Sequence, residues 1–264
     1  MDFIVDSKKV FAYTAAHEFD PAKPTLVFVH GAGLDHSWWG LQSRYFGYHG
    51  WNVMACDLPA HGRSAGPPVG SIGDLADWIT RLMDAAQLSK ASLIGHSMGA
   101  LVSLECAARV PARVERIALL GAAFPMNVSD AFMEAARCND VSAFDMETIW
   151  GHAPQVPFAA NPNPGMWMYG DTLARLSRLA PGVLHTDLRA CKDYSAGLES
   201  AGRVGCPALM IMGGQDMMTP PRAATALLKA LSSAASVSIA CSGHSLMAEA
   251  PDATLDALIG FLKQ

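Results

Sequence analysis

The segment ASLIGHSMGALVSLECAA, residues 91–108, joins an apolar run to a helical pattern through a serine that lies between two glycines. Residues 91–95 have the length and composition of a buried strand, and residues 98–108 have those of a buried helix. A strand that turns directly into a helix needs small residues on both sides of the turn, and Gly95 and Gly99 supply them. We therefore expect Ser97 in a strained turn at the edge of a sheet, facing the positive end of the helix dipole.

The alternation of short apolar strands with helices continues on both sides of this segment. Strands are predicted at residues 10–15, 25–29, 52–56, 91–95, 116–120, 208–212 and 236–240, and helices at residues 71–87, 98–108, 222–231 and 251–262. Continuous apolar strands separated by helices indicate an α/β protein in which helices cover both faces of a parallel sheet.

Residues 124–186 interrupt this alternation. They are rich in proline and in bulky, soft side chains, mostly Met, Phe and Trp. Ligands bind at the carboxyl edge of the strands in an open α/β sheet, so we predict that residues 124–186 form a helical cap, or lid, over that edge. Residues 1–123 and 187–264 would then form the core. The alternative is a small second domain in which these side chains are ordinary core residues.

Composition and charge limit the class of protein and its partners. With 51% hydrophobic and 16% charged residues among 264, the chain is not largely disordered. The excess of 24 acidic over 19 basic residues speaks against a nucleic-acid or anionic-membrane partner. We expect a cytoplasmic protein, because there is neither an N-terminal signal pattern nor a membrane-length apolar run. The 6 cysteines form no CxxC motif, which favours free thiols and no bound metal.

A serine hydroxyl becomes a nucleophile at neutral pH only beside a base, and that base needs a carboxylate to hold its tautomer. His244 and Asp216 each follow a late predicted strand, so both belong to the same edge as Ser97. His96 adjoins the serine, but its side chain is expected to point away and to pack. The predicted catalytic residues are therefore Ser97, Asp216 and His244.

Acyl transfer also needs hydrogen-bond donors for the oxyanion that develops in the transition state. We expect the backbone amides of Met98, directly after the nucleophile, and of Ala32, in the glycine-rich loop after residues 25–29, to be these donors.

Bulky apolar side chains are predicted to line the substrate pocket. Soft, adaptable side chains suit an apolar acyl group. The candidates are Trp150, Met166, Trp167 and Met217. Arg175, Arg178 and Arg189 form no basic cluster, although one of them could bind a single carboxylate.

Four motifs make the chain resemble the α/β-hydrolase family, and they appear in the family's order. They are the HGxG loop at residues 30–33, the GxSxG turn at 95–99, GxxD at 213–216 and GH at 243–244. Residues 57–64 are similar to a further loop of the family, with Ala at position 60 where Gly is usual. The resemblance implies a mostly parallel, eight-stranded sheet with a cap.

Within that family the chain is most similar to small lidded carboxylesterases and enol-lactonases. The resemblance implies that Ser97, Asp216 and His244 hydrolyse carboxylic esters of small, largely apolar substrates through an acyl-enzyme, without a cofactor or metal. A lactone or enol-lactone hydrolase and a carbon–carbon bond hydrolase with the same three residues stay open as alternatives. A non-catalytic ligand-binding protein is a further alternative from another class. The oligomeric state is left open.

Overall fold

The computed structural model describes residues 1–20, 23–156 and 166–263, and residues 157–165 of the expected cap lie outside these ranges. The strands are β1 (Asp2–Val5), β2 (Lys8–Tyr13), β3 (Thr25–Val29), β4 (Asn52–Cys56), β5 (Ala91–His96), β6 (Val114–Leu120), β7 (Ala208–Gly213) and β8 (Ala234–Ile239). The α-helices are α1 (Gly40–Tyr48), α2 (Ile72–Ala85), α3 (Met98–Arg109), α4 (Asp130–Arg137), α5 (Val141–Trp150), α6 (Met168–Leu176), α7 (Val183–Asp193), α8 (Gly197–Arg203), α9 (Pro221–Ala230), α10 (Leu246–Glu249) and α11 (Pro251–Leu262). The 3-10 helices η1 (His36–Trp39) and η2 (Pro111–Arg113) lie between them.

In the described part of the chain, the strands form one eight-stranded sheet in the order β1-β2-β4-β3-β5-β6-β7-β8. The pairs β1–β2 and β2–β4 are antiparallel, and the remaining neighbours are parallel. The predicted mostly parallel sheet is thus confirmed. β1 was not predicted, because Asp2 and Ile4 face solvent in an edge hairpin, so its sequence contains no continuous apolar run.

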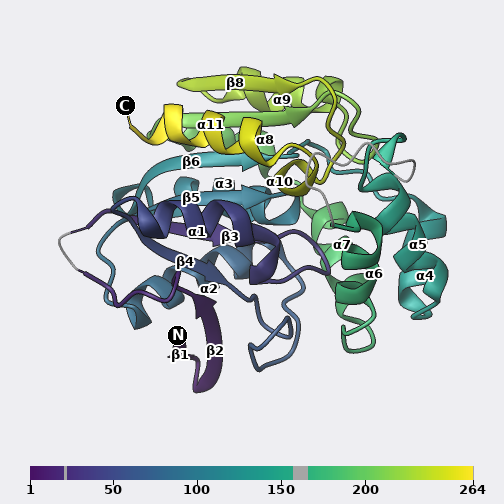
Figure 1. Cartoon of the computed structure of the whole chain (residues 1–264), viewed down its shortest axis with the longest axis horizontal. Helices are drawn as coiled ribbons and strands as arrows, with labels where there is room; N and C mark the ends of the chain where they lie inside the picture. Colours follow the sequence, from purple (N-terminus) through teal and green to yellow (C-terminus); the bar gives the residue numbers. More distant parts are fainter. Residues whose placement is uncertain (21–22, 157–165, 264) are drawn as a thin grey trace.

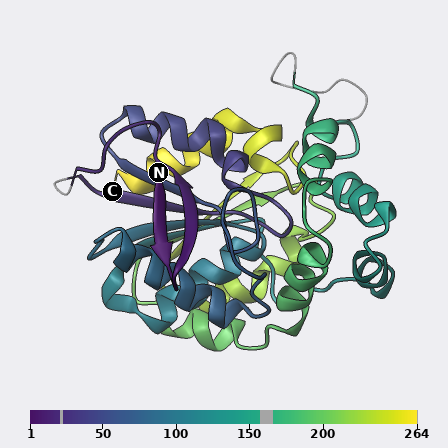
Figure 2. The same cartoon turned by 90° about the horizontal axis from the view of Figure 1, so that it is seen from below.

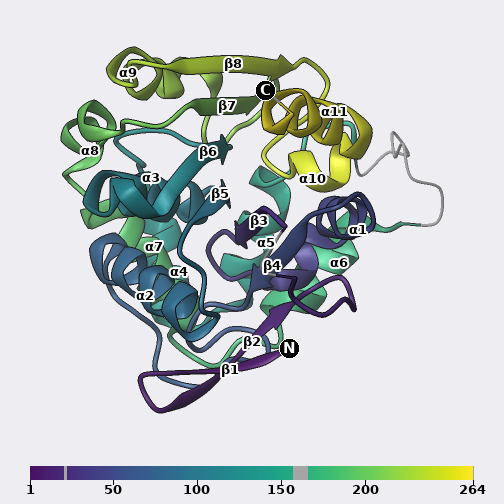
Figure 3. The ribbon, with the colours of Figure 1, turned by 90° about the vertical axis from the view of Figure 1, so that its left-hand side faces the viewer.

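Helices cover both faces of the sheet, with α2, α3 and α8 on one side and α1 and α11 on the other (Figure 3). Successive side chains of a strand point to opposite faces, so a strand covered on both sides is apolar throughout. β3 shows this: Val27 and Val29 join the core cluster that includes α2 and α3, while Leu26 and Phe28 join the cluster that includes α1 and α11.

Helices α4, α5, α6 and α7 lie beyond the carboxyl ends of the parallel strands (Figures 1 and 2). Two of them begin at capping side chains: the Ser129 hydroxyl accepts the Phe132 N–H at the start of α4, and the Asp140 carboxylate accepts the Ser142 N–H at the start of α5. The expected boundary after residue 186 falls inside α7. The division into core and cap stays a prediction.

Candidate active site

Ser97 occupies the turn between β5 and α3 with φ 52° and ψ −117°, a left-handed conformation that is costly for a residue with a side chain. Its N–H donates to Leu120 O at 2.9 Å, which holds the turn against β6. A Cβ at Gly95 would overlap the Gly99 backbone, and a Cβ at Gly99 would overlap the Val29 carbonyl. Only glycines therefore permit this close approach of strand and helix.

Asp216 and His244 meet in the loops that follow β7 and β8. Asp216 Oδ2 lies 2.8 Å from His244 Nδ1, and both side chains are buried. The other carboxylate oxygen accepts the N–H groups of Met218 at 2.8 Å and Thr219 at 2.7 Å. Burial opposes ionisation of Asp216, but His244 and Thr219 together lower the pKa of its carboxyl to about 2. Asp216 is thus an anion fixed in place beside the imidazole.

The ring of His244 is held in one orientation. Burial disfavours the charged imidazolium, but the Asp216 carboxylate beside it raises the pKa of His244 above its ordinary value. The ring packs on Gly121, where a Cβ would approach it to 3.0 Å at a φ of +56°. His96 Nε2 donates to the His244 carbonyl at 2.9 Å, and the two rings lie 4.6 Å apart. His96 therefore supports the histidine loop by packing.

With Nδ1–H donated to Asp216, Nε2 of His244 is the free acceptor of a neutral imidazole. This buried atom has no hydrogen-bond partner among the described residues. The Ser97 hydroxyl, on a side chain that is 9% exposed, is not joined to it at hydrogen-bond distance. The structure therefore brings Asp216 and His244 together, whereas a hydrogen bond between Ser97 and His244 stays a prediction.

Glu249 ties the histidine loop to the segment after α5. Its carboxylate accepts the N–H groups of Gly243 at 3.0 Å, Ser245 at 3.1 Å and Ala153 at 2.9 Å. Ser245 also donates its N–H and its hydroxyl to Gly151 O, at 2.9 and 2.6 Å. The position of His244 thus depends on the segment after α5, which lies far from it in sequence.

The loop at residues 30–33 lies against the nucleophile turn. A Cβ at Gly31 would lie 3.2 Å from Ser97 Cβ, and Ala32 lines the same cavity as Ser97. In the part of the chain that the structure describes, the Ala32 N–H has no acceptor. Met98 is the first residue of α3, so its N–H has no acceptor one turn back in the helix. Both predicted oxyanion donors are therefore available, although their function stays a proposal.

A cavity of about 320 Å³ opens at Ser97, a volume at the lower end of the range for small-molecule sites. Among the described residues its lining is mainly apolar, and it is formed by Ala32, Ser97, Met126, Asn127, Val128, Ser129, Phe132, Glu147, Trp150, Leu188, Cys191, Met217, Met218 and Thr219. Trp150 and Met217 are thus among the residues that line the cavity, and their part in substrate binding stays a prediction.

Met166 and Trp167 are not part of this lining, which corrects their expected place in the pocket. Trp167 is 76% exposed and Met166 is 39% exposed. The indole ring lies on Gly170, which has no side chain to push it away, so it covers the outside of α6. Aromatic and methionine composition alone did not show whether these two residues, which precede α6, face the cavity or the solvent.

A family model described as the alpha/beta hydrolase family matches residues 26–257. The chain belongs to the α/β-hydrolase family. (E)-2-((N-methylformamido)methylene)succinate hydrolase of Acinetobacter baylyi is 25% identical over 208 residues, 76% of this chain and 76% of that protein. 2-Hydroxy-6-oxo-2,4-heptadienoate hydrolase of Pseudomonas putida is 27% identical over 157 residues, 54% of this chain and 49% of that protein. The enol-lactonase of Burkholderia xenovorans LB400 shares the fold, with a TM-score of 0.88 and 22% identity over 100% of both chains.

A second buried histidine–carboxylate pair anchors the 30–33 loop of this α/β hydrolase. His61 Nε2 donates to Asp187 Oδ2 at 2.8 Å, and the same oxygen accepts the Gly33 N–H at 2.9 Å. The other ring nitrogen donates to Pro59 O at 3.0 Å, so both ring nitrogens face acceptors, an arrangement that favours the imidazolium. Burial opposes this charge, but Asp187 raises the pKa of His61 above its ordinary value. Helix α7 thereby holds the loop that carries Ala32.

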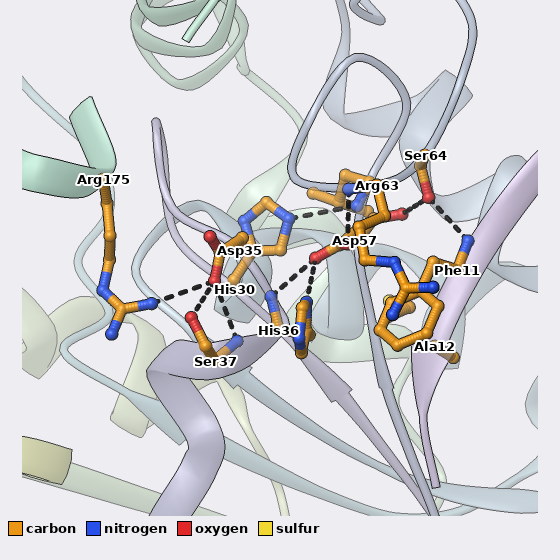
Figure 4. Close-up of polar contacts among 12 residues, drawn as sticks. Phe11, Ala12, His30, Asp35, His36, Ser37, Asp57, Arg63, Ser64 and Arg175 are labelled. Carbon is orange, nitrogen blue, oxygen red and sulfur yellow. Dashed lines mark hydrogen bonds and ion pairs between the residues drawn. The ribbon is translucent and has the colours of Figure 1, made fainter. Parts of the chain in front are cut away.

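Asp57 organises the loop after β4, as Figure 4 shows. One carboxylate oxygen accepts the N–H and the Nδ1–H of His36, both at 2.7 Å, and the other accepts the Arg63 N–H at 2.8 Å. Within the described ranges, ligand atoms of Asp35, His36 and Asp57 lie within 4.8 Å of one another. Arg175 and Ser37 already donate hydrogen bonds to the Asp35 carboxylate. A cation would have to displace these contacts, so we propose no metal site here.

Glu147 is the acidic residue among the cavity-lining residues that the sequence analysis missed. It lies one turn before Trp150 on α5, and it is 8% exposed. A lone glutamate in a helix is usually solvated, so only the proximity of Glu147 to Trp150 on one helix face could have indicated its place.

No helix among the described residues has both the length and the apolar character needed to span a membrane.

Proposed function

We propose that this α/β hydrolase is a serine hydrolase that cleaves carboxylic esters of small, largely apolar substrates through an acyl-enzyme. The observation that carries the proposal is the Asp216–His244 pair, joined at 2.8 Å, whose free Nε2 lies buried and unpartnered. A general base needs this arrangement: one ring nitrogen fixed by a carboxylate and the other ready to accept a proton.

In the first step, His244 Nε2 takes the proton of the Ser97 hydroxyl as its oxygen attacks the ester carbonyl. A small adjustment of the Ser97 side chain closes the missing hydrogen bond, as happens in many hydrolases when substrate binds. The carbonyl oxygen gains negative charge, which the N–H groups of Ala32 and Met98 stabilise. A single donor of this kind is worth about 3 kcal/mol in the transition state.

His244 then gives its proton to the leaving alcohol, and an acyl group stays on Ser97. In the second step, water attacks the acyl carbonyl while His244 accepts a proton from it. His244 then returns this proton to Ser97 Oγ as the bond from Oγ to the acyl carbon breaks and the carboxylic acid leaves. Asp216 stabilises the imidazolium in both steps. These residues balance every proton transfer without a metal or an organic cofactor.

The test is hydrolysis of 4-nitrophenyl esters of increasing acyl length, together with a set of lactones, by the wild-type protein and by Ser97→Ala. We expect turnover of short esters, and a loss of about 10³-fold or more in kcat for the variant. Unchanged turnover in Ser97→Ala would refute the proposal.

The alternative chemistries give different results in the same screen. A lactone hydrolase would turn over lactones and leave open-chain esters intact. A carbon–carbon bond hydrolase would react with a fluorophosphonate at Ser97 and cleave none of these substrates. A ligand-binding protein without activity would likewise cleave none of these substrates, but it would not react with the fluorophosphonate.

A further inference from the structure

The cavity that contains Ser97 also contains one carboxyl group without a partner. Glu147 is 8% exposed, and its Oε2 is fully buried with no hydrogen-bond partner among the described residues. It belongs to α5, and it shares the cavity with the proposed nucleophile. Burying a carboxyl group without compensation costs free energy, so such a group indicates a ligand that supplies the missing contact.

The charged groups around Glu147 leave it without a fixed cation. Two titratable groups act on the pKa of Glu147 in opposite directions: His244 lowers it and Asp187 raises it. Mainly because of burial, the pKa of Glu147 rises from 4.5 to about 7. The described lining holds no lysine or arginine. Arg175 is engaged by Asp35 and Asp171 and lies outside the lining.

We propose that Glu147 determines substrate specificity by binding a positively charged amine at the end of the substrate's acyl group. This inference rests on the proposed esterase function, since it assigns the acyl group to this cavity. An ammonium group supplies an N–H donor to the unpartnered Oε2 of Glu147 and a positive charge to a site whose described lining has no lysine or arginine.

The apolar walls strengthen the discrimination between acyl groups. Charges interact more strongly in a site of low dielectric constant than in water, so a carboxylate near Glu147 is repelled as an ammonium group is attracted. The methylene groups of the substrate's acyl group would then lie against the apolar side chains of the cavity, which are those of Met126, Val128, Phe132 and Leu188. The expected order of preference is ammonium, then uncharged, then carboxylate.

The experiment compares three methyl esters that share a spacer of five methylene groups: methyl 6-aminohexanoate, methyl heptanoate and monomethyl heptanedioate. At pH 8.5, where Glu147 with its pKa of about 7 is ionised, we expect wild type to prefer the ammonium ester to the uncharged ester in kcat/KM. Glu147→Gln keeps the shape of the side chain and removes its charge. This preference should therefore fall by tenfold or more, which corresponds to the loss of one hydrogen bond to a charged group. Glu134→Gln, on an exposed part of α4, should keep the wild-type preference.

Binding of hexylamine and of hexanoate to Ser97→Ala, measured by calorimetry with and without Glu147→Gln, tests the site independently of catalysis. Tighter binding of hexylamine that Glu147→Gln abolishes supports the amine site. Ester turnover without any ammonium preference, and equal binding of hexylamine with and without the change, would overturn the inference and leave the esterase function standing. Absence of turnover with all esters would count against the esterase function, while the calorimetry still decides on the amine site.

Discussion

Replacing Glu147 by Gln should change how the stability of the protein depends on pH. In the folded protein, burial, with a smaller contribution from Asp187, raises the pKa of this carboxyl to about 7 from its ordinary 4.5, against the opposing effect of His244. Below pH 4.5 the group is protonated in the folded and unfolded states, so it has no effect on unfolding. Between the two pKa values the unfolded chain ionises while the folded protein keeps its proton, and stability falls by about 1.4 kcal/mol per pH unit.

The free energy of unfolding of wild type should therefore lose roughly 3 kcal/mol through Glu147 as the pH rises from 4.5 to 7, and no more above 7. Glutamine does not titrate, so Glu147→Gln lacks this loss. The difference between variant and wild type should move in favour of the variant across this interval and then become constant. Taking the difference removes the contribution of His61, which titrates in both proteins, whereas the part of the His244 contribution that depends on Glu147 remains in the difference.

The measurement is urea unfolding at pH 4.5, 5.5, 6.5, 7.5 and 8.5, followed by circular dichroism, with equal m-values as the check for two-state behaviour. Glu115→Gln is the matched control, because this side chain is exposed on β6 and away from the cavity. It should follow wild type at every pH. A constant difference between Glu147→Gln and wild type over the whole pH range would refute the reasoning from burial.

Three further substitutions test other parts of the structure. Asp216→Asn should lower kcat by about 10⁴-fold. It should also move the acid limb of the pH–rate profile to lower pH, because the Asp216 carboxylate raises the pKa of His244. An unchanged pH–rate profile would contradict this. Asp187→Asn should cost roughly 3 kcal/mol of stability in chemical unfolding. That loss should be largest below pH 6.5, where the ion pair is intact, and should shrink as the pH rises through the raised pKa of His61. Gly202→Ala, at an exposed position of helix α8, should stabilise the protein by about 0.5–1 kcal/mol, because a Cβ there meets open space. A lower melting temperature would contradict this.

Patterns that repeat over a few residues predicted the main elements well. β3 and β4 have the predicted limits, since a strand buried on both faces needs an unbroken apolar run. The turn at Ser97 was also predictable, because only small residues allow a strand and a helix to approach so closely there. β1 was not predicted, because it is an edge strand whose pairing with β2 compensates for the lack of an apolar run.

The sequence by itself therefore determined the parallel sheet, the family and the edge on which the candidate residues lie, because these follow from local periodicity and short motifs. Tertiary structure alone decided which side chains meet: the 2.8 Å contact of Asp216 with His244, the enclosure of Glu147 in the cavity, and the exposure of Trp167. The reason is that burial and electrostatic partners depend on segments far apart in the chain, and a helical pattern alone does not show what will cover each face.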